Sequence, residues 1–197
     1  MDFIARHCTL CGLPKILNSI GSFSCGDPDL DDFFRNDAIK YEHELFGKTY
    51  SFRHKKNGDL VSLFTVSNGS IQARQMKRNL RDAITYPKRL IHNYPSVLIG
   101  RLAVAEGYQS KNIGSEMLNF IKIWFSDPQN KTGCRFLAVD AYNNEKILSF
   151  YKSNDFGFIF KNETEERESL KLTEAETLYT RMMCFDLYNH ACSRNSD

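Results

Sequence analysis

The sequence lacks the features of a secreted or membrane protein. It has no uninterrupted apolar run of membrane-spanning length, and its first residues contain no apolar segment followed by a small-residue cleavage site. It also lacks an excess of charge of one sign, because 26 basic side chains stand against 24 acidic ones. The charge of the whole chain therefore does not indicate a nucleic-acid or membrane-surface protein. We expect a soluble, cytoplasmic protein with no membrane partner, in which any electrostatic argument must be local.

The cysteines do not have the pattern of a disulfide framework. The six cysteines are scattered, which is typical of reduced thiols in a cytosol rather than of disulfides: Cys8, Cys11, Cys25, Cys134, Cys184 and Cys192. Cys8 and Cys11 have the spacing of a zinc knuckle, yet no second pair follows, and a structural zinc site usually needs four ligands. We expect no metal site, and the alternative role for these two cysteines is as small apolar side chains.

Length and periodicity predict one α/β domain. The 197 residues, 42% of them hydrophobic, are enough for one domain with a substantial core, so we predict a single domain over 1–197. An amphipathic helix is predicted within 27–47 because apolar residues recur at steps of three and four: Leu30, Phe33, Phe34, Ala38, Tyr41 and Leu45. The other predicted elements are a hairpin of strands 48–52 and 60–68, a basic helix-like stretch 70–83, strand 96–105, helix 113–126, strand 135–141, short helix 144–154, strand 156–161, an acidic loop or short helix within 162–176, and strand 179–187. Strands that alternate with helices indicate an α/β sheet of mixed direction.

One strand-turn-helix junction carries a candidate phosphate site. The turn "GYQSKNIGSEML" over 107–118 follows an apolar strand and leads into a helix at Gly114. The N-terminus of a helix has unpaired backbone N–H groups and partial positive charge, so it suits a phosphate if the preceding backbone comes close. Lys111 adds charge, and Gln109 and Ser110 add hydrogen-bonding groups. Taken alone, the turn is equally consistent with an ordinary surface connection.

A second candidate site lies about thirty residues downstream. Asn144 precedes Tyr151 by seven residues, two helical turns, which places both roughly on one helix face. From spacing alone, Tyr151 also fits a core aromatic beside Ile147 and Leu148, and Asn144 fits a helix cap.

Together the two motifs resemble the GNAT superfamily of acyl-CoA-dependent N-acetyltransferases. The pyrophosphate loop of that family runs Gln or Arg, two variable residues, Gly, one variable residue, then Gly or Ala, and here Gln109 begins it and Gly114 ends it. The family's Asn, Tyr and Phe at spacings of seven and five correspond to Asn144, Tyr151 and Phe156. The resemblance implies a mixed, mostly antiparallel, twisted sheet of about six to seven strands flanked by helices, splayed between a central strand (97–105) and the next strand (135–141). Its core motifs cover 97–160, and the acidic segment 162–178 is variable.

The resemblance also implies a cofactor and roles for residues. Acetyl-CoA would be the co-substrate, bound through the central strand and the loop by Leu102, Ala103, Val104, Gln109, Ser110, Lys111, Asn112, Ile113, Gly114 and Ser115. Tyr151 would protonate the departing thiolate as general acid, and Asn144 would support it as a contact to pantetheine or substrate. No general base is identifiable, since Glu106 fits a water-linked base but also a solvated turn acid.

Two residues depart from the family pattern. Asn112 and Asp155 stand where the family usually has glycine. Asn and Asp are the non-glycine residues that most readily adopt positive φ. We therefore predict that the backbone keeps the shape of glycine at both positions.

The acceptor amine is the least determined part of the prediction. The segment 71–101 is rich in basic residues, which suits a nucleic-acid backbone or, equally, a solvated helix face: Arg74, Lys77, Arg78, Arg81, Lys88, Arg89 and Arg101. "FSCGDPDLDDFFRNDA" and "LIGRLAVAEGYQ" resemble a branch of toxin-like GNAT enzymes that acetylate the amino group of aminoacyl-tRNA. That resemblance implies a tRNA-linked acceptor, with a homodimer and an antitoxin as further partners to consider. The alternatives are a small amine or protein amino group as acceptor, and a catalytically silent module that binds CoA or nucleic acid.

Overall fold

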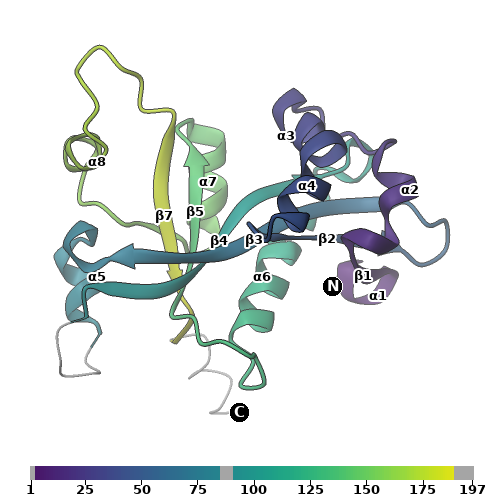
Figure 1. Ribbon diagram of the computed structural model, residues 1–197, viewed down its shortest axis with the longest axis horizontal. Coiled ribbons are helices and arrows are strands. Elements are labelled where there is room, and N and C mark those ends of the chain that lie inside the picture. The colour runs from purple at the N-terminus through teal and green to yellow at the C-terminus, as the bar shows by residue number, and fades with distance from the viewer. Residues whose placement is uncertain (1–2, 85–90, 189–197) are drawn as a thin grey trace. The chain divides into compact units, whose positions relative to one another are not determined.

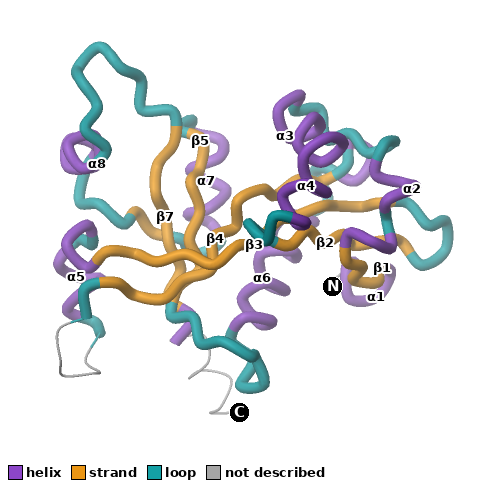
Figure 2. The backbone as a smooth tube through the Cα atoms, viewed as in Figure 1, coloured by secondary structure: helices purple, strands orange, loops and turns teal. Residues whose placement is uncertain are grey.

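A seven-stranded sheet with flanking helices forms the frame of the molecule (Figure 1, Figure 2). The computed structural model describes residues 3–84 and 91–188. The strands, in the order in which they lie in the sheet, are β1 (Cys8–Gly12), β2 (Lys48–His54), β3 (Leu60–Gln72), β4 (Asn93–Val104), β5 (Phe136–Tyr142), β7 (Thr180–Asp186) and β6 (Gly157–Phe158). The helices are α1 (Phe3–His7), α2 (Leu17–Ile20), α3 (Pro28–Asp32), α4 (Ala38–His43), α5 (Arg78–Asp82), α6 (Ile113–Phe125), α7 (Glu145–Ser153) and α8 (Glu163–Ser169).

The register makes the sheet mixed, as predicted. β1 pairs with β2, β2 with β3, β5 with β7 and β6 with β7, all antiparallel. β4 and β5 pair in parallel, with Ser96–Leu98 opposite Phe136–Ala138. The predicted hairpin of β2 and β3 and the predicted strands β4, β5 and β7 are confirmed. That the two parallel strands splay beyond this short ladder stays a prediction.

The chain divides into two compact units, each with its own core. The first unit comprises residues up to 67 and 99–121, and the second comprises 68–98 and the residues from 122 onward. The first core contains Leu13, Ile16, Ile20, Phe23, Phe34, Ala38, Leu60, Leu63 and Ala103. The second contains Ile71, Ala73, Met76, Tyr94, Phe136, Ala138, Ile159, Phe160 and Cys184. The prediction of one acetyltransferase domain over 1–197 stays a prediction.

The first unit is covered by the predicted amphipathic segment. Asp27 caps α3, because its carboxylate accepts hydrogen bonds from the backbone of Asp29 and Leu30. A π-helical turn (Phe33–Asp37) joins α3 to α4, and Phe34 and Ala38 are fully buried. The predicted burial of Leu45 is wrong, since its side chain is 82% exposed and its φ is +62°. The helix ends at His43, so Leu45 no longer lies on the buried face.

In the second unit, a strand, a turn and a short helix replace the helix predicted over 70–83. β3 continues to Gln72, a 3-10 turn (Ala73–Gln75) follows, and α5 has only five residues. Ile71 and Ala73, two residues apart, are both buried, which is the period of a strand rather than a helix. The predicted strand over 156–161 is likewise shorter, with β6 limited to two residues.

The N-terminal cysteines serve as apolar side chains. They lie three residues apart on β1, a strand that was not predicted, so they point to opposite faces. Cys8 is buried and Cys11 packs against the first core. The described cysteines are free thiols, and Cys192 lies outside the described residues. In residues 3–84 and 91–188 no helix is long and apolar enough to cross a membrane, and no cluster of His, Cys, Asp and Glu could hold a metal ion.

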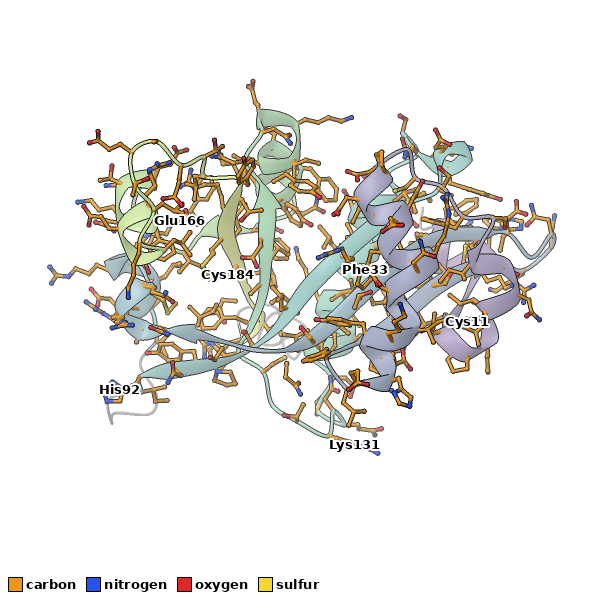
Figure 3. The ribbon with its side chains drawn as sticks, turned by 45° about the horizontal axis from the view of Figure 1, so that its top comes forward. Cys11, Phe33, His92, Lys131, Glu166 and Cys184 are labelled. Atoms are coloured by element: carbon orange, nitrogen blue, oxygen red, sulfur yellow. The ribbon has the colours of Figure 1, made fainter. Side chains whose placement is uncertain are left out.

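Most of the acidic segment is exposed, but one of its glutamates is buried. It forms α8, a short helix as expected, but Glu166 on that helix is completely buried. Its carboxylate accepts a hydrogen bond of 2.6 Å from Nε of Arg181 on β7, and Arg181 also pairs with Glu163 at 2.6 Å. Figure 3 shows Glu166 on α8 and Cys184 on β7, the strand to which this buried ion pair attaches the helix.

Candidate active site

The candidate phosphate loop has an unusual backbone. Between the 3-10 turn Glu106–Tyr108 and the first residue of α6, both Ser110 and Asn112 have a φ of +60°. The positive φ predicted for Asn112 is therefore confirmed, while that of Ser110 was not foreseen. Gln109 has a φ of −64°, so the loop alternates between negative and positive φ. Gln109 itself is extended, with a ψ of 164°, and the turn that follows it can direct successive N–H groups toward one concave side, which we call the nest.

The helix behind the loop adds to this electrostatic preference. α6 is thirteen residues long, and the carbonyl of Asn112 accepts a hydrogen bond from the N–H of Glu116 at 3.1 Å. Ile113, Met117 and Ile121 form the buried face of this helix. A long, well-anchored helix carries partial positive charge at its N-terminus, next to the nest. The loop and the start of α6 together suit a phosphate or pyrophosphate group.

Two side chains of the loop are already engaged with the protein. The amide nitrogen of Gln109 donates to the carbonyls of Cys25, at 2.7 Å, and Val104, at 3.0 Å. Nζ of Lys111 donates to the carbonyl of Gly107 at 2.9 Å and lies 5.3 Å from the ring centroid of Tyr108. Gln109 thus fastens the loop to the segment before α3 and to the end of β4. Its side chain supports the shape of the loop, while Lys111 stays exposed and keeps its charge at the surface.

The end of β4 carries the strand residues that are predicted to contact the cofactor. Ala103 is buried in the first core, and Leu102 and Val104 are half-buried. The N–H of Ala105, just past the strand, donates to the carbonyl of Val61 on β3 at 2.9 Å. These residues and the loop all belong to the first unit. The structure therefore brings together the predicted strand and loop residues of the cofactor site.

Glu106 is exposed at the beginning of the same turn. It lines a cavity of about 520 Å³ together with residues of α2, the β2–β3 turn and the segment before α3, among them Ser24, Arg53, Asp59 and Tyr108. The position agrees with a solvated turn acid. A role as water-linked base stays a prediction.

Asn144 and Tyr151 lie on α7 in the second unit. Asn144 is the N-cap of α7, and its side-chain oxygen accepts a hydrogen bond of 3.0 Å from the N–H of Ile147. Tyr151 is 9% exposed, and its ring centroid lies 5.2 Å from that of Phe150 and 5.5 Å from that of Phe156. Burial raises the pKa of Tyr151 well above its ordinary value, so the phenol stays protonated at neutral pH. The cap and core roles are thus both real, and they leave a catalytic role open.

The turn after α7 confirms the second departure from glycine. Asp155 has a φ of +64°, as predicted from its residue type. The N–H groups of Asn154 and Phe156 both donate to the carbonyl of Tyr151, at 3.1 and 3.0 Å. The turn is therefore built directly onto the backbone of Tyr151.

The predicted basic residues that the structure describes are divided between the two units. Arg74, Arg78 and Arg81 are exposed in the second unit, where Arg78 pairs with Asp82 at 3.2 Å and Arg74 donates to Gln72. Lys77 is half-buried there, and its N–H donates to the carbonyl of Ile159. Arg101 belongs to the first unit, where its guanidinium lies 4.8 Å from the ring centroid of Phe33, which is labelled in Figure 3. Lys88 and Arg89 lie outside the described residues.

Lys122 is an important residue that sequence reasoning missed. It lies in the last turn of α6 and is 6% exposed, although lysine is rarely buried. Burial lowers the pKa of Lys122, while the hydrogen bond and the charge of Asp155 act in the opposite direction. Only the three-dimensional contact with a turn some thirty residues away reveals its environment, so no local signal marked it.

The fold and both motifs define an acyl-CoA-dependent N-acetyltransferase, and the chain belongs to the acetyltransferase (GNAT) family, whose pattern matches residues 44–158. Over 143 residues it is 27% identical to the tRNA-acetylating toxin of Mycobacterium tuberculosis (strain ATCC 25618 / H37Rv), a match that covers 71% of this chain and 78% of the relative.

Solved structures of toxin acetyltransferases share the fold. AtaT complexed with acetyl-methionyl-tRNAfMet matches with a TM-score of 0.72 and 17% identity, over 95% of this chain and 99% of that one. AtaTR bound with AcCoA matches with a TM-score of 0.67 and 18% identity, over 95% and 98%. An AtaT variant bound to the C-terminus of the antitoxin AtaR matches with a TM-score of 0.66 and 17% identity, over 96% and 98%.

Proposed function

We propose that this protein is a cytoplasmic enzyme that transfers the acetyl group of acetyl-CoA to the amino group of an aminoacyl-tRNA. The binding of acetyl-CoA is supported chiefly by the loop from Gln109 to Asn112, whose turn with two positive φ values forms the nest in front of α6. The acceptor part is supported by the likeness to the tRNA-acetylating toxin.

In this proposal the end of β4 and the loop after it bind acetyl-CoA. The backbone of Leu102, Ala103 and Val104 bonds the pantetheine arm. The pyrophosphate sits on the N–H groups of the loop and the first turn of α6, from Ser110 to Ser115, and the charge of Lys111 favours it. Because Gln109 holds the loop from behind, the nest exists before the cofactor arrives, and binding does not have to order it.

In this proposal Tyr151 supplies the acid. The acceptor nitrogen attacks the acetyl carbonyl, a C–N bond forms as the C–S bond breaks, and the departing thiolate takes a proton from the hydroxyl of Tyr151. The proton lost by the acceptor nitrogen restores the phenol. Burial keeps Tyr151 protonated between turnovers, and Asn144 fixes the start of the helix that carries it. Placement of Tyr151 at the thioester is part of the proposal.

An aminoacyl-tRNA suits a site without an identified general base. The ester linkage withdraws electrons from the amino group, which lowers its pKa and leaves more of it unprotonated at neutral pH. Exposed basic side chains such as Arg74, Arg78 and Arg81 are available to a phosphate backbone. A second copy of the chain and an antitoxin are the protein partners we propose to look for, by light scattering after size-exclusion chromatography and by co-purification.

The proposal is tested with a panel of acceptors. The protein is incubated with acetyl-CoA and with charged tRNA, deacylated tRNA, a polyamine or a peptide, while thiol release is followed. We expect release to require charged tRNA. If a polyamine or a peptide supports release and charged tRNA does not, the acceptor assignment is wrong and the acetyltransferase assignment stands. If acetyl-CoA binds by calorimetry and no acceptor supports release, the chain is a silent binding module.

A further inference from the structure

A buried lysine holds the turn that follows the candidate general acid. Nζ of Lys122 donates a hydrogen bond of 2.8 Å to the carbonyl of Asn154 and lies 3.3 Å from Oδ2 of Asp155. Nζ also lies 4.0 Å from the ring centroid of Phe185 on β7 and 5.8 Å from that of Phe156. The ammonium group is thus enclosed by a carbonyl, a carboxylate and two aromatic faces, which together satisfy a buried cation.

The same turn encloses Tyr151. Both Asn154 and Phe156 bond the carbonyl of Tyr151 through their N–H groups, and the ring of Phe156 packs edge-on against that of Tyr151. The contacts of the Lys122 ammonium group with Asn154 and Phe156 are therefore one step removed from Tyr151. A shift of the turn would move both the end of α7 and the ring of Phe156 that packs against Tyr151.

Asp155 explains why the family's glycine is absent. Glycine would adopt the same positive φ without strain, but it has no carboxylate. Asp155 accepts that conformation and places an anion beside the ammonium group of Lys122. The side chain of Asp155 is exposed and stays hydrated, whereas the ammonium group of Lys122 is buried.

This arrangement is costly compared with an apolar one. Removing an ammonium group from water has a large cost in free energy, and a methionine of similar length would fill the same space without that cost. A buried charge in such a place fixes geometry, because its hydrogen bonds are directional and apolar contacts are not.

We propose that Lys122 is a positioning residue for Tyr151, which it holds in place through the Asn154–Phe156 turn. The inference rests on the proposed function insofar as Tyr151 is the acid in acetyl transfer. It adds a second residue pair, Lys122 and Asp155, to the machinery of that step.

The first test is Lys122→Met, with Lys146→Met as control. Lys146 is an exposed lysine on the same helix as Tyr151, so its removal changes the net charge equally. We expect Lys122→Met to lower kcat by roughly tenfold or more, since small misplacements of a catalytic group are expensive, and to leave KM for acetyl-CoA within about twofold. In a Tyr151→Phe background the same change should lower kcat no further. An unchanged kcat, or an equal loss in both backgrounds, overturns the proposal.

The second test does not depend on activity. Protein labelled with ¹³C-tyrosine gives a ring signal for Tyr151 that is assigned by its absence in Tyr151→Phe. Lys122→Met should shift or broaden this signal, and Lys146→Met should not. If Tyr151→Phe proves fully active, the acid role fails, and this signal still decides whether Lys122 positions the ring. A Tyr151 signal that is unchanged in folded Lys122→Met contradicts the inference.

Asp155→Gly covers the case in which Lys122→Met does not fold. The variant keeps a residue that accepts positive φ and removes the carboxylate together with its methylene group. Asp155 is the charged group acting on the pKa of Lys122 among the described residues, so its loss lowers that pKa further. The alkaline limb of the kcat profile should then move to lower pH. A profile superimposable on that of the unmodified protein would show that the pair does not act on Tyr151.

Discussion

At the scale of single residues, two positions show how a chain keeps a glycine-shaped backbone without glycine. Asn112 and Asp155 both have positive φ, and both are residue types whose short polar side chains tolerate it. Their side chains differ in use. The exposed Asn112 contributes chiefly its backbone to the loop, whereas Asp155 also pairs with Lys122.

Substitution at Asn112 separates backbone shape from side-chain chemistry. Asn112→Gly should keep acetyl-CoA affinity within about threefold, because glycine adopts positive φ readily. Asn112→Val should weaken binding by roughly tenfold or more, because a β-branched residue is strained there by about 1–2 kcal/mol or more and the nest deforms. Isothermal titration calorimetry with acetyl-CoA measures both. Equal affinity of the valine variant and the unmodified protein would show that the loop shape is not needed.

Tyr151→Phe tests the acid directly. The loss of one hydroxyl should lower kcat by roughly 10² to 10⁴ when a general acid is removed. The melting temperature should change little, because the ring packing against Phe150 and Phe156 is retained. Circular dichroism and steady-state thiol release give the two values. Undiminished turnover would assign Tyr151 to the core alone.

At the scale of elements, α8 is attached through charge rather than through apolar packing. Glu166 is fully buried and bonds both Nε of Arg181 and the N–H of Met182 on β7. Glu166→Ala leaves the buried guanidinium of Arg181 with the half-exposed Glu163 as its one carboxylate partner among the described residues. We expect this change to lower the free energy of unfolding by about 3 kcal/mol.

Urea unfolding measures this loss, and Glu168→Ala is the matched control. Glu168 is an exposed glutamate on the same helix, so its removal should change the free energy of unfolding by less than about 0.5 kcal/mol. If both variants unfold at the same urea concentration, the buried pair does not stabilise the second unit.

Elements with clear periodicity were predictable, and those defined by distant contacts were not. α6 and the β2–β3 hairpin follow from residues close in sequence, namely the buried face from Ile113 to Ile121 and the turn after His54. β1 was missed because five residues with mixed burial carry little signal, and it exists as a partner of β2. The burial of Lys122 and Glu166 depends on partners far along the chain, on the turn after α7 and on β7. For the same reason the motifs predicted the loop and the positive φ of Asn112, but they did not predict that hydrogen bonds from Gln109 hold the loop.

At the scale of the whole molecule, buried thiols predict a loss of stability in alkali. Burial raises the pKa of Cys184 to about 12, and that of Cys8 and Cys25 to about 11, from an ordinary value of 9.0. The thiols ionise more easily in the unfolded chain than in the folded one. Their contribution to the free energy of unfolding is therefore complete below about pH 9 and falls as the pH rises toward the folded-state pKa.

The slope of stability against pH isolates this effect. Urea midpoints between pH 8 and roughly 10.5 should fall for the unmodified protein, and Cys184→Ala should show a shallower decline because it removes the group with the largest shift. Parallel slopes for the two proteins would mean that Cys184 ionises as easily in the folded as in the unfolded state.

The central claim is that the acetyl group reaches the amino group of an aminoacyl-tRNA. The most direct measurement is a single turnover with acetyl-labelled CoA and charged tRNA, followed by alkaline release of the amino acid and chromatography. The account predicts that the label appears in the N-acetyl amino acid, and that Tyr151→Phe slows its appearance by roughly 10² to 10⁴. Label that stays in acetyl-CoA in the presence of charged tRNA, or that remains on the tRNA after the amino acid is released, would contradict it.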